Sequence, residues 1–241
     1  MDKKEKRFWQ IASPTIAEVL EQFLEEQQTR VKSDTFRKYA DIVYLFRESM
    51  NGYAYQYLGK EQKELFDHFY GLQGEDHREF CDIFGPSEIL ENVSEFLNYF
   101  MIRKVMCGKE LLKAAGTVIK KLVKCLAEHG HVDSESIEDY ADQAGRASKE
   151  LPAMEELSEL LWKYAVNQAN MEFQETAEGY FSVHNVENGR IHLEDLGGMK
   201  VVLTLPPEIA SRCKSGWSIN LALGKIKGQW KILEVGNVYP Y

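Results

Sequence analysis

The 241-residue sequence lacks the marks of a membrane, secreted or disulfide-rich protein. No apolar run approaches the roughly 18 residues that a membrane span requires. The first ten residues are largely charged and no apolar segment follows them, so we do not expect a secretory signal. The four cysteines are widely spaced and form no C-x-x-C pair, which favours reduced, buried thiols: Cys81, Cys107, Cys125 and Cys213. We therefore expect a cytoplasmic protein that does not associate with membranes.

The familiar catalytic motifs are also absent. There is no P-loop, no G-x-G-x-x-G, no G-x-S-x-G and no H-E-x-x-H, and no matched acid, base and nucleophile stand out. We expect no catalytic residues, no cofactor and no metal. His129, His131 and Asp133 do offer three metal-binding groups close together. Gly130, between the two histidines, indicates the end of a helix, where a histidine interacts favourably with the helix dipole. We prefer this helix-end interpretation to a metal site.

Charge is distributed unevenly along the chain. The net charge of −9, from 29 basic and 38 acidic residues, argues against a general binder of polyanions. Residues 101–130, however, hold 7 basic and 2 acidic residues. They lie between residues 61–100, with 2 basic and 10 acidic, and residues 131–180, with 3 and 12. The basic residues therefore form a short island between two acidic stretches.

Up to about residue 178 the apolar residues recur at helical spacing. A helix is predicted after Thr15, and a second begins at Ser33 or Asp34 and ends at Gly52 as a left-handed cap. The remaining predicted helices cover 61–70, 89–101, 109–129, 134–147 and 151–165. Residues 53–85 are rich in aromatic and acidic residues. The alternating Tyr53, Tyr55 and Tyr57 are compatible with a platform on which nucleic-acid bases stack, but we favour packing in the core or at a hinge between helices or domains.

The segment after Gly108 gives the clearest helix. Its apolar residues occupy one arc, Leu111 through Leu126, and its lysines occupy the opposite arc. With two neighbouring basic residues, these are the candidate nucleic-acid-binding residues: Lys109, Lys113, Lys120, Lys121, Lys124, Arg103 and Lys104.

From Gly179 the apolar period falls to two, which predicts strands. Asn188-Gly189 predicts a type I′ hairpin, and Pro206-Pro207 opens a short helix between the third and fourth strands. Five strands in this order resemble a small OB-type barrel, with an SH3-like topology as the alternative. Its expected core is Phe181, Trp217 and Trp230, and its polar candidates for a ligand face are Arg190, His192, Lys200, Lys225 and Lys227.

The predicted fold class is therefore α+β: an amino-terminal helical bundle followed by a small five-stranded β-barrel. The predicted domains are a helical domain over 1–133, an acidic helical connector over 134–178 and a β-barrel over 179–241.

Residues 15–133 resemble a known family. The segments that match are 15–29, Ser33-Asp34-Thr35-Phe36-Arg37-Lys38-Tyr39, 90–100 and 109–130, the last ending in a glycine turn. They resemble the SAM-like core-binding domain of tyrosine recombinases of the phage integrase type, with an acidic insertion at 53–85. The resemblance implies that the basic helix contacts DNA phosphates. It does not extend to catalysis, because no histidine is followed three residues later by arginine, and Tyr239 and Tyr241 have no activating partners.

Two functions follow from these features. The first is nucleic-acid binding, to DNA above all, through the lysine face. The alternative is a protein-interaction or assembly factor whose acidic and basic patches pair with a partner, between copies in a homodimer, or within the chain. A lysine face is also what an ordinary solvated helix shows.

Overall fold

The protein is described from a computed structural model that places residues 10–166 and 173–240. The chain divides into two compact units. One, the helical unit, comprises residues 1–101 and 113–148, and the other, the sheet unit, comprises residues 102–112 and 149–241. The division passes through two helices, α9 (Lys109–Glu128) and α10 (Glu138–Val166), which each supply residues to both units.

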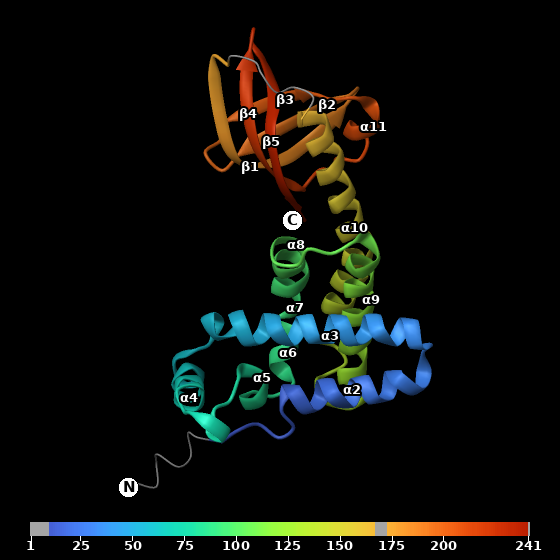
Figure 1. The fold of residues 1–241 in the computed structure, drawn as a ribbon, viewed down its shortest axis with the longest axis vertical. Coiled ribbons are helices and arrows are strands. Elements are labelled where there is room, and N and C mark those ends of the chain that lie inside the picture. Colours follow the sequence, from blue (N-terminus) through green and yellow to red (C-terminus); the bar gives the residue numbers. More distant parts are fainter. Residues whose placement is uncertain (1–9, 167–172, 241) are drawn as a thin grey trace. The chain divides into compact units, whose positions relative to one another are not determined.

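The helical unit begins with two long helices that lie side by side, α2 (Ile16–Arg30) and α3 (Ser33–Tyr53) (Figure 1). Thr15 caps α2 as predicted: its hydroxyl accepts from the Glu18 N–H at 3.2 Å, and the Glu18 carboxylate accepts from the Thr15 N–H at 2.8 Å. Shorter elements follow: η1 (Ala54–Tyr57), α4 (Lys60–Tyr70), η2 (Gly74–Asp76), α5 (Phe80–Ile83), α6 (Ser87–Glu91), α7 (Val93–Glu95), η3 (Phe96–Phe100) and α8 (Met101–Arg103).

Large apolar side chains fill the core of the helical unit. Phe46 of α3 and Phe96 of η3 are fully buried with ring centroids 4.8 Å apart. The predicted apolar arc of α9 is buried as well, with Val118, Ile119 and Leu122 at most 1% exposed. The amphipathic pattern of α9 is thus confirmed.

Three helical predictions differ from the structure. Helix α3 has Lys32 as its N-cap and runs through Gly52. The helix expected over 89–101 is divided twice: it breaks at Asn92 between α6 and α7, and a π-helical turn at Phe96–Phe100 then separates α7 from α8. The two helices expected over 134–165 are one helix, α10, with Pro152 inside it. Proline removes one helix hydrogen bond. Leu151 before it and Met154 after it are buried, and the packing of these side chains offsets that loss.

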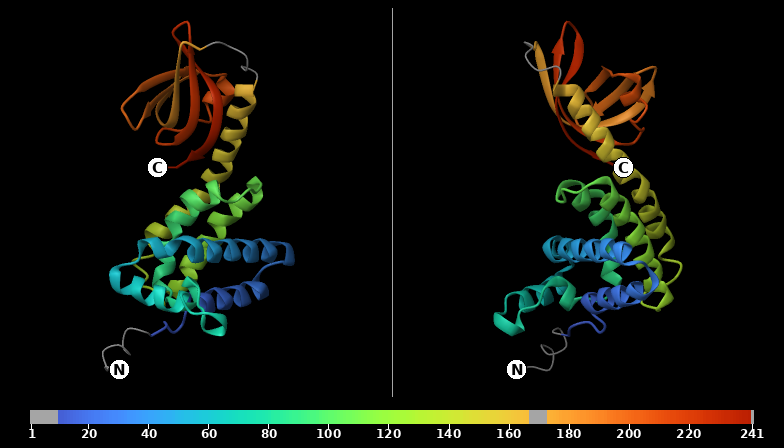
Figure 2. Two further views of the ribbon diagram at one scale, coloured as in Figure 1. Left: turned by 60° about the vertical axis from the view of Figure 1, so that its left-hand side comes forward. Right: turned by 45° about the vertical axis from the view of Figure 1, so that its right-hand side comes forward.

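Within the helical unit, α9 and α10 approach each other closely at Gly116. A Cβ placed on Gly116 would lie 2.4 Å from the Ala144 carbonyl oxygen and 2.3 Å from the Ser148 backbone nitrogen. Only a residue without a side chain permits this separation of the two backbones. Figure 2 shows α9 and α10 running alongside each other in two further views.

The sheet unit contains a five-stranded antiparallel sheet in the order β3-β2-β1-β4-β5. Its strands are β1 (Glu175–Glu187), β2 (Arg190–Asp195), β3 (Lys200–Thr204), β4 (Ser218–Ile226) and β5 (Gln229–Tyr239), with α11 (Pro207–Ala210) after β3. Asn188 and Gly189 both have positive φ, 50° and 78°, which confirms the predicted type I′ turn between β1 and β2.

The α+β fold class is confirmed, whereas the closed barrel is not. In the described strands, β3 and β5 form the two edges and no ladder joins them. Closing a barrel requires a continuous ladder around the sheet. Strand β3 is only five residues long, and Pro206 and Pro207, which follow it after Leu205, have no N–H to extend a ladder. Phe181 and Trp217 are core residues, as expected, while Trp230 is half-buried beside Lys225.

Candidate functional site

The lysines of α9 differ in exposure. Lys113 and Lys124 are exposed, and Lys120 and Lys121 are half-buried. The Lys120 side chain lies against Gly145 of α10, with Nζ 3.0 Å from the position a Cβ would occupy there. The helical unit therefore holds four of the predicted binding residues on one helix, and two of them are exposed.

In the part of the chain that the structure describes, these four ammonium groups form no ion pair with a carboxylate. Among the described residues, none of the recorded ion pairs involves Lys113, Lys120, Lys121 or Lys124. Lys109, which belongs to the sheet unit, differs, because its Nζ lies 3.6 Å from a carboxylate oxygen of Glu159 on α10.

The remaining predicted residues, Arg103 and Lys104, also belong to the sheet unit. Arg103 donates hydrogen bonds to the hydroxyls of Tyr180 and Tyr239, at 3.2 and 3.5 Å. The two tyrosine rings meet edge to face with centroids 5.8 Å apart. Arg103 is therefore held by the sheet, a position that its place in the sequence beside the lysine helix did not indicate.

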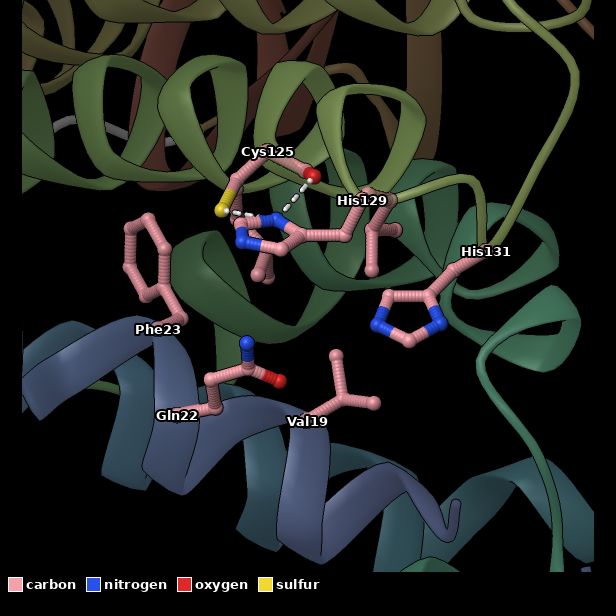
Figure 3. Close-up of a pocket in the computed structure, with 8 residues that line it drawn as sticks. Val19, Gln22, Phe23, Cys125, His129 and His131 are labelled. Atoms are coloured by element: carbon pink, nitrogen blue, oxygen red, sulfur yellow. Dashed lines mark hydrogen bonds between the residues drawn. The ribbon is translucent and has the colours of Figure 1, made fainter. Parts of the chain in front are cut away.

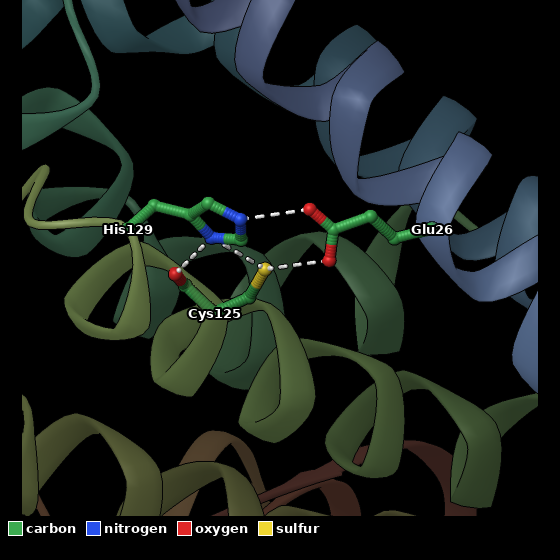
Figure 4. A group of neighbouring side chains, drawn as sticks. All are labelled: Glu26, Cys125 and His129. Carbon is green, nitrogen blue, oxygen red and sulfur yellow. Dashed lines mark hydrogen bonds and ion pairs between the residues drawn. The ribbon is translucent and has the colours of Figure 1, made fainter.

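A separate cluster of chemically active side chains lies in the helical unit. Glu26 from α2 meets Cys125 and His129, which are one turn apart on and just after α9 (Figure 4). His129 Nε2 lies 2.8 Å from Glu26 Oε1, and His129 Nδ1 lies 3.3 Å from Cys125 Sγ. Cys125 Sγ lies 3.8 Å from the other carboxylate oxygen, Glu26 Oε2. Three different donor types, a thiol, an imidazole and a carboxylate, therefore converge.

The end of α9 brings a second imidazole to this place. Gly130 has φ 71°, a left-handed conformation that confirms the predicted cap. The His131 N–H then donates back to the Leu126 carbonyl at 2.9 Å, and the rings of His129 and His131 stack with centroids 6.0 Å apart. Both imidazoles line a small pocket of about 10 Å³, and α2 forms its other side through Val19, Gln22 and Phe23 (Figure 3).

Burial and neighbouring charge make Cys125 a weak nucleophile. Burial raises the pKa of its thiol to about 11, and Glu26 and Glu128 act in the same direction while Lys121 opposes them. Since the thiolate is the reactive form, the thiol is almost fully protonated near neutral pH.

Sequence reasoning found only part of this cluster. It considered His129 and His131 together with Asp133, but Asp133 is exposed and its carbonyl accepts from Ser136 instead. It missed Glu26 and Cys125 as partners of His129. The i, i+4 spacing of Cys125 and His129 was an available signal, whereas Glu26 lies 99 residues from Cys125 and no local pattern connects them.

The other candidate residues are dispersed. On the sheet, Arg190 and Lys200 are exposed and His192 is half-buried, while Lys225 pairs with Glu175 at 2.9 Å and Lys227 occupies the turn between β4 and β5. Among the tyrosines, Tyr55 stacks on Phe66 with centroids 5.5 Å apart and Tyr53 meets Phe100 edge to face, while Tyr57 is 69% exposed.

The described residues define a two-unit α+β protein with a lysine-bearing helix and a Glu-Cys-His cluster. Comparisons of the chain with protein-family models, with curated proteins and with solved structures found no match. The integrase resemblance therefore stays a prediction. Within the described part of the chain, no helix is long and apolar enough to span a membrane.

Proposed function

We propose that this protein binds nucleic acid, DNA above all, through the face of α9 that presents Lys113, Lys120, Lys121 and Lys124. The observation that supports the proposal is that, in the described residues, these four ammonium groups have no ion-paired carboxylate although the chain as a whole carries a net charge of −9. The alternative is that the basic residues bind the protein's own acidic segments. In that case we would expect these lysines to form ion pairs, as Lys109 does with Glu159.

The dimensions of the lysine face suit a phosphate backbone. Lys113 and Lys124 are eleven residues apart, which is about 16 Å along a helix. Duplex DNA carries about one negative charge per 1.7 Å of its axis, so several phosphates fall within reach of this length. Flexible lysines bind phosphates as point charges and need no fixed geometry.

The sheet unit gives a second line of support. Its strand order, β3-β2-β1-β4-β5 with a helix between β3 and β4, resembles that of an OB-type fold, although β3 and β5 form no ladder among the described strands. Folds of that type bind oligonucleotides. The resemblance of residues 15–133 to integrase core-binding domains points to the same class of ligand.

The test is a binding titration of labelled duplex and single-stranded DNA and RNA against the full chain at several salt concentrations. Four phosphate contacts predict a slope of log affinity against log salt of about −3.6, or about a 150-fold loss between 50 and 200 mM salt. The variant Lys113→Glu/Lys124→Glu changes the two exposed lysines and should reduce the slope to about −1.8 or less.

A matched control variant keeps the net charge of the test variant. Lys60→Glu/Lys63→Glu makes the same change in charge at exposed positions of α4, in the acidic part of the helical unit. It should bind as the unmodified chain does. Equal loss in both variants would mean that total charge matters and the α9 face does not. No binding at low salt, with a shift in solution mass of the α9 variant alone, would favour assembly instead.

A further inference from the structure

We propose that Glu26, Cys125 and His129 form a Zn²⁺ site that ties α2 to the carboxyl end of α9. The three side chains supply a carboxylate oxygen, a sulfur and an imidazole nitrogen, which are the ligand types that zinc takes in proteins. One ligand atom from each residue lies within 4.8 Å of the other two.

The separations between donors fit a tetrahedral ion. Zinc bonds of about 2.0–2.3 Å place neighbouring donors about 3.3–3.8 Å apart in a tetrahedron. Cys125 Sγ lies 3.3 Å from His129 Nδ1 and 3.8 Å from Glu26 Oε2, while the other ring nitrogen, Nε2, lies 2.8 Å from Glu26 Oε1. Nδ1 also lies 2.8 Å from the Cys125 carbonyl oxygen, so an ion bound through Nδ1 replaces that contact. Figure 4 shows the three side chains facing one another, Glu26 from α2 and the other two from the end of α9. Because one ion takes one nitrogen of the His129 ring, the imidazole must turn to direct that nitrogen at the ion.

The cluster is anchored on one side and accessible on the other. Cys125 is 5% exposed, while the side chains of His129 and Glu26 are 31% and 22% exposed. The pocket lined by Gln22 and His131 lies beside them, and its volume of about 10 Å³ is about that of one water molecule, the group that takes the fourth position (Figure 3). Binding breaks the Cys125 S–H bond, forms the Zn–S bond and releases the proton to solvent.

The surrounding charges favour a cation. Glu26 and Glu128 place negative charge near the Cys125 sulfur, and Lys121 places positive charge there. Arg30 lies 3.6 Å from Glu26 Oε2. A thiolate from Cys125 and the carboxylate of Glu26 together carry two negative charges, which match the charge of a divalent ion.

Two other interpretations explain less of the geometry. A catalytic thiol–imidazole–carboxylate triad needs a reactive, reachable sulfur, but Cys125 is buried on a helix and its thiol is protonated near neutral pH. A plain ion pair accounts for the 2.8 Å contact between His129 and Glu26, and His129 Nδ1 lies 2.8 Å from the Cys125 carbonyl oxygen. That interpretation gives no role to the Cys125 thiol, which faces both side chains.

The test uses the metal-free full chain in reducing buffer, with Co²⁺ as a spectroscopic probe and Zn²⁺ as the competitor. We expect one Co²⁺ per chain, a thiolate-to-cobalt charge-transfer band, and loss of that band when one equivalent of Zn²⁺ is added. Zn²⁺ should also raise the midpoint of thermal unfolding, since it binds only the folded site.

Variants identify the ligands. Cys125→Ser should abolish the charge-transfer band, and Glu26→Gln and His129→Gln should each lower the affinity for Zn²⁺ by about 100-fold or more, since loss of an outer partner alone costs about 10–100-fold. Cys107→Ser is the matched control, because it removes a half-buried thiol of the sheet unit and should leave the band unchanged.

Several results would overturn the site. They are the absence of a charge-transfer band in the unmodified chain, a band retained in Cys125→Ser, and a band lost in Cys107→Ser. Glu26→Gln keeps the size of its side chain and the thiol, so it remains informative should Cys125→Ser fail to fold. Unchanged Zn²⁺ affinity in Glu26→Gln would refute the proposal even then.

Discussion

Replacing Gly116 with alanine tests the close approach of α9 and α10. The added Cβ would lie 2.3 Å from the Ser148 nitrogen, 2.4 Å from the Ala144 oxygen and 2.7 Å from the Ser148 Cα. All three are backbone atoms, so no side chain can rotate away. The two helices must separate by about 1 Å before the contact becomes an ordinary van der Waals contact of about 3.4–4 Å.

Two opposing effects set the size of the change. Alanine is favoured over glycine in a helix interior by about 1 kcal/mol. Overpacking a close-packed contact costs about 1–3 kcal/mol. Because the added Cβ meets only backbone atoms of α10, we place the cost at the upper end of that range. We therefore expect Gly116→Ala to lower the free energy of unfolding by about 2 kcal/mol. For a chain of this length, that corresponds to a fall of about 4–8 °C in the unfolding midpoint.

Gly52→Ala is the matched control, because Gly52 lies in α3 without a positive φ and a Cβ added to it would meet no atom within 4 Å. It should raise the free energy of unfolding by about 0.5–1 kcal/mol through backbone entropy alone. Thermal and urea unfolding followed by circular dichroism measure both variants. If Gly116→Ala were as stabilising as Gly52→Ala, the close contact between α9 and α10 would be refuted.

Two further predictions concern protonation and thiol access. Burial, with Glu159 adding to it and Lys109 opposing it, raises the pKa of Glu155 above its ordinary value of 4.5, so stability should fall as pH rises through that raised pKa. Glu155→Gln should remove this fall in urea unfolding measured between about pH 4 and pH 8, and an unchanged pH profile would contradict the assignment. Cys107 is half-buried whereas Cys81, Cys125 and Cys213 are buried, so an alkylating reagent should modify Cys107 first. Peptide mapping by mass spectrometry measures the order, and equally fast modification of Cys213 would count against it.

Local signals in the sequence predicted much of the secondary structure. The capping box at Thr15 and the type I′ turn at Asn188-Gly189 involve only residues that are neighbours along the chain. The alternation that includes Trp217 and Ile219 likewise predicted a strand whose buried face the structure confirms. In each case the physical requirement, a donor to satisfy or a face to bury, is met within a few residues.

Predictions failed where distant residues decide the outcome. Pro152 was expected to begin a helix, but burial of apolar side chains on both sides of it maintains one continuous helix. Five strands with a helix before the fourth predicted a barrel, but closure depends on whether β3 and β5 form a ladder, and neither strand specifies that by itself.

The sequence by itself determined that lysines oppose an apolar face on α9, because helical periodicity fixes which residues share a face. The tertiary structure decided which of those lysines pair with carboxylates: Lys109 meets Glu159, whereas Lys113 and Lys124 are exposed. Only the tertiary structure places Glu26 beside Cys125 and His129. Glu26 and Cys125 are 99 residues apart in the sequence, and they meet because α2 packs against α9, which no periodic pattern predicts.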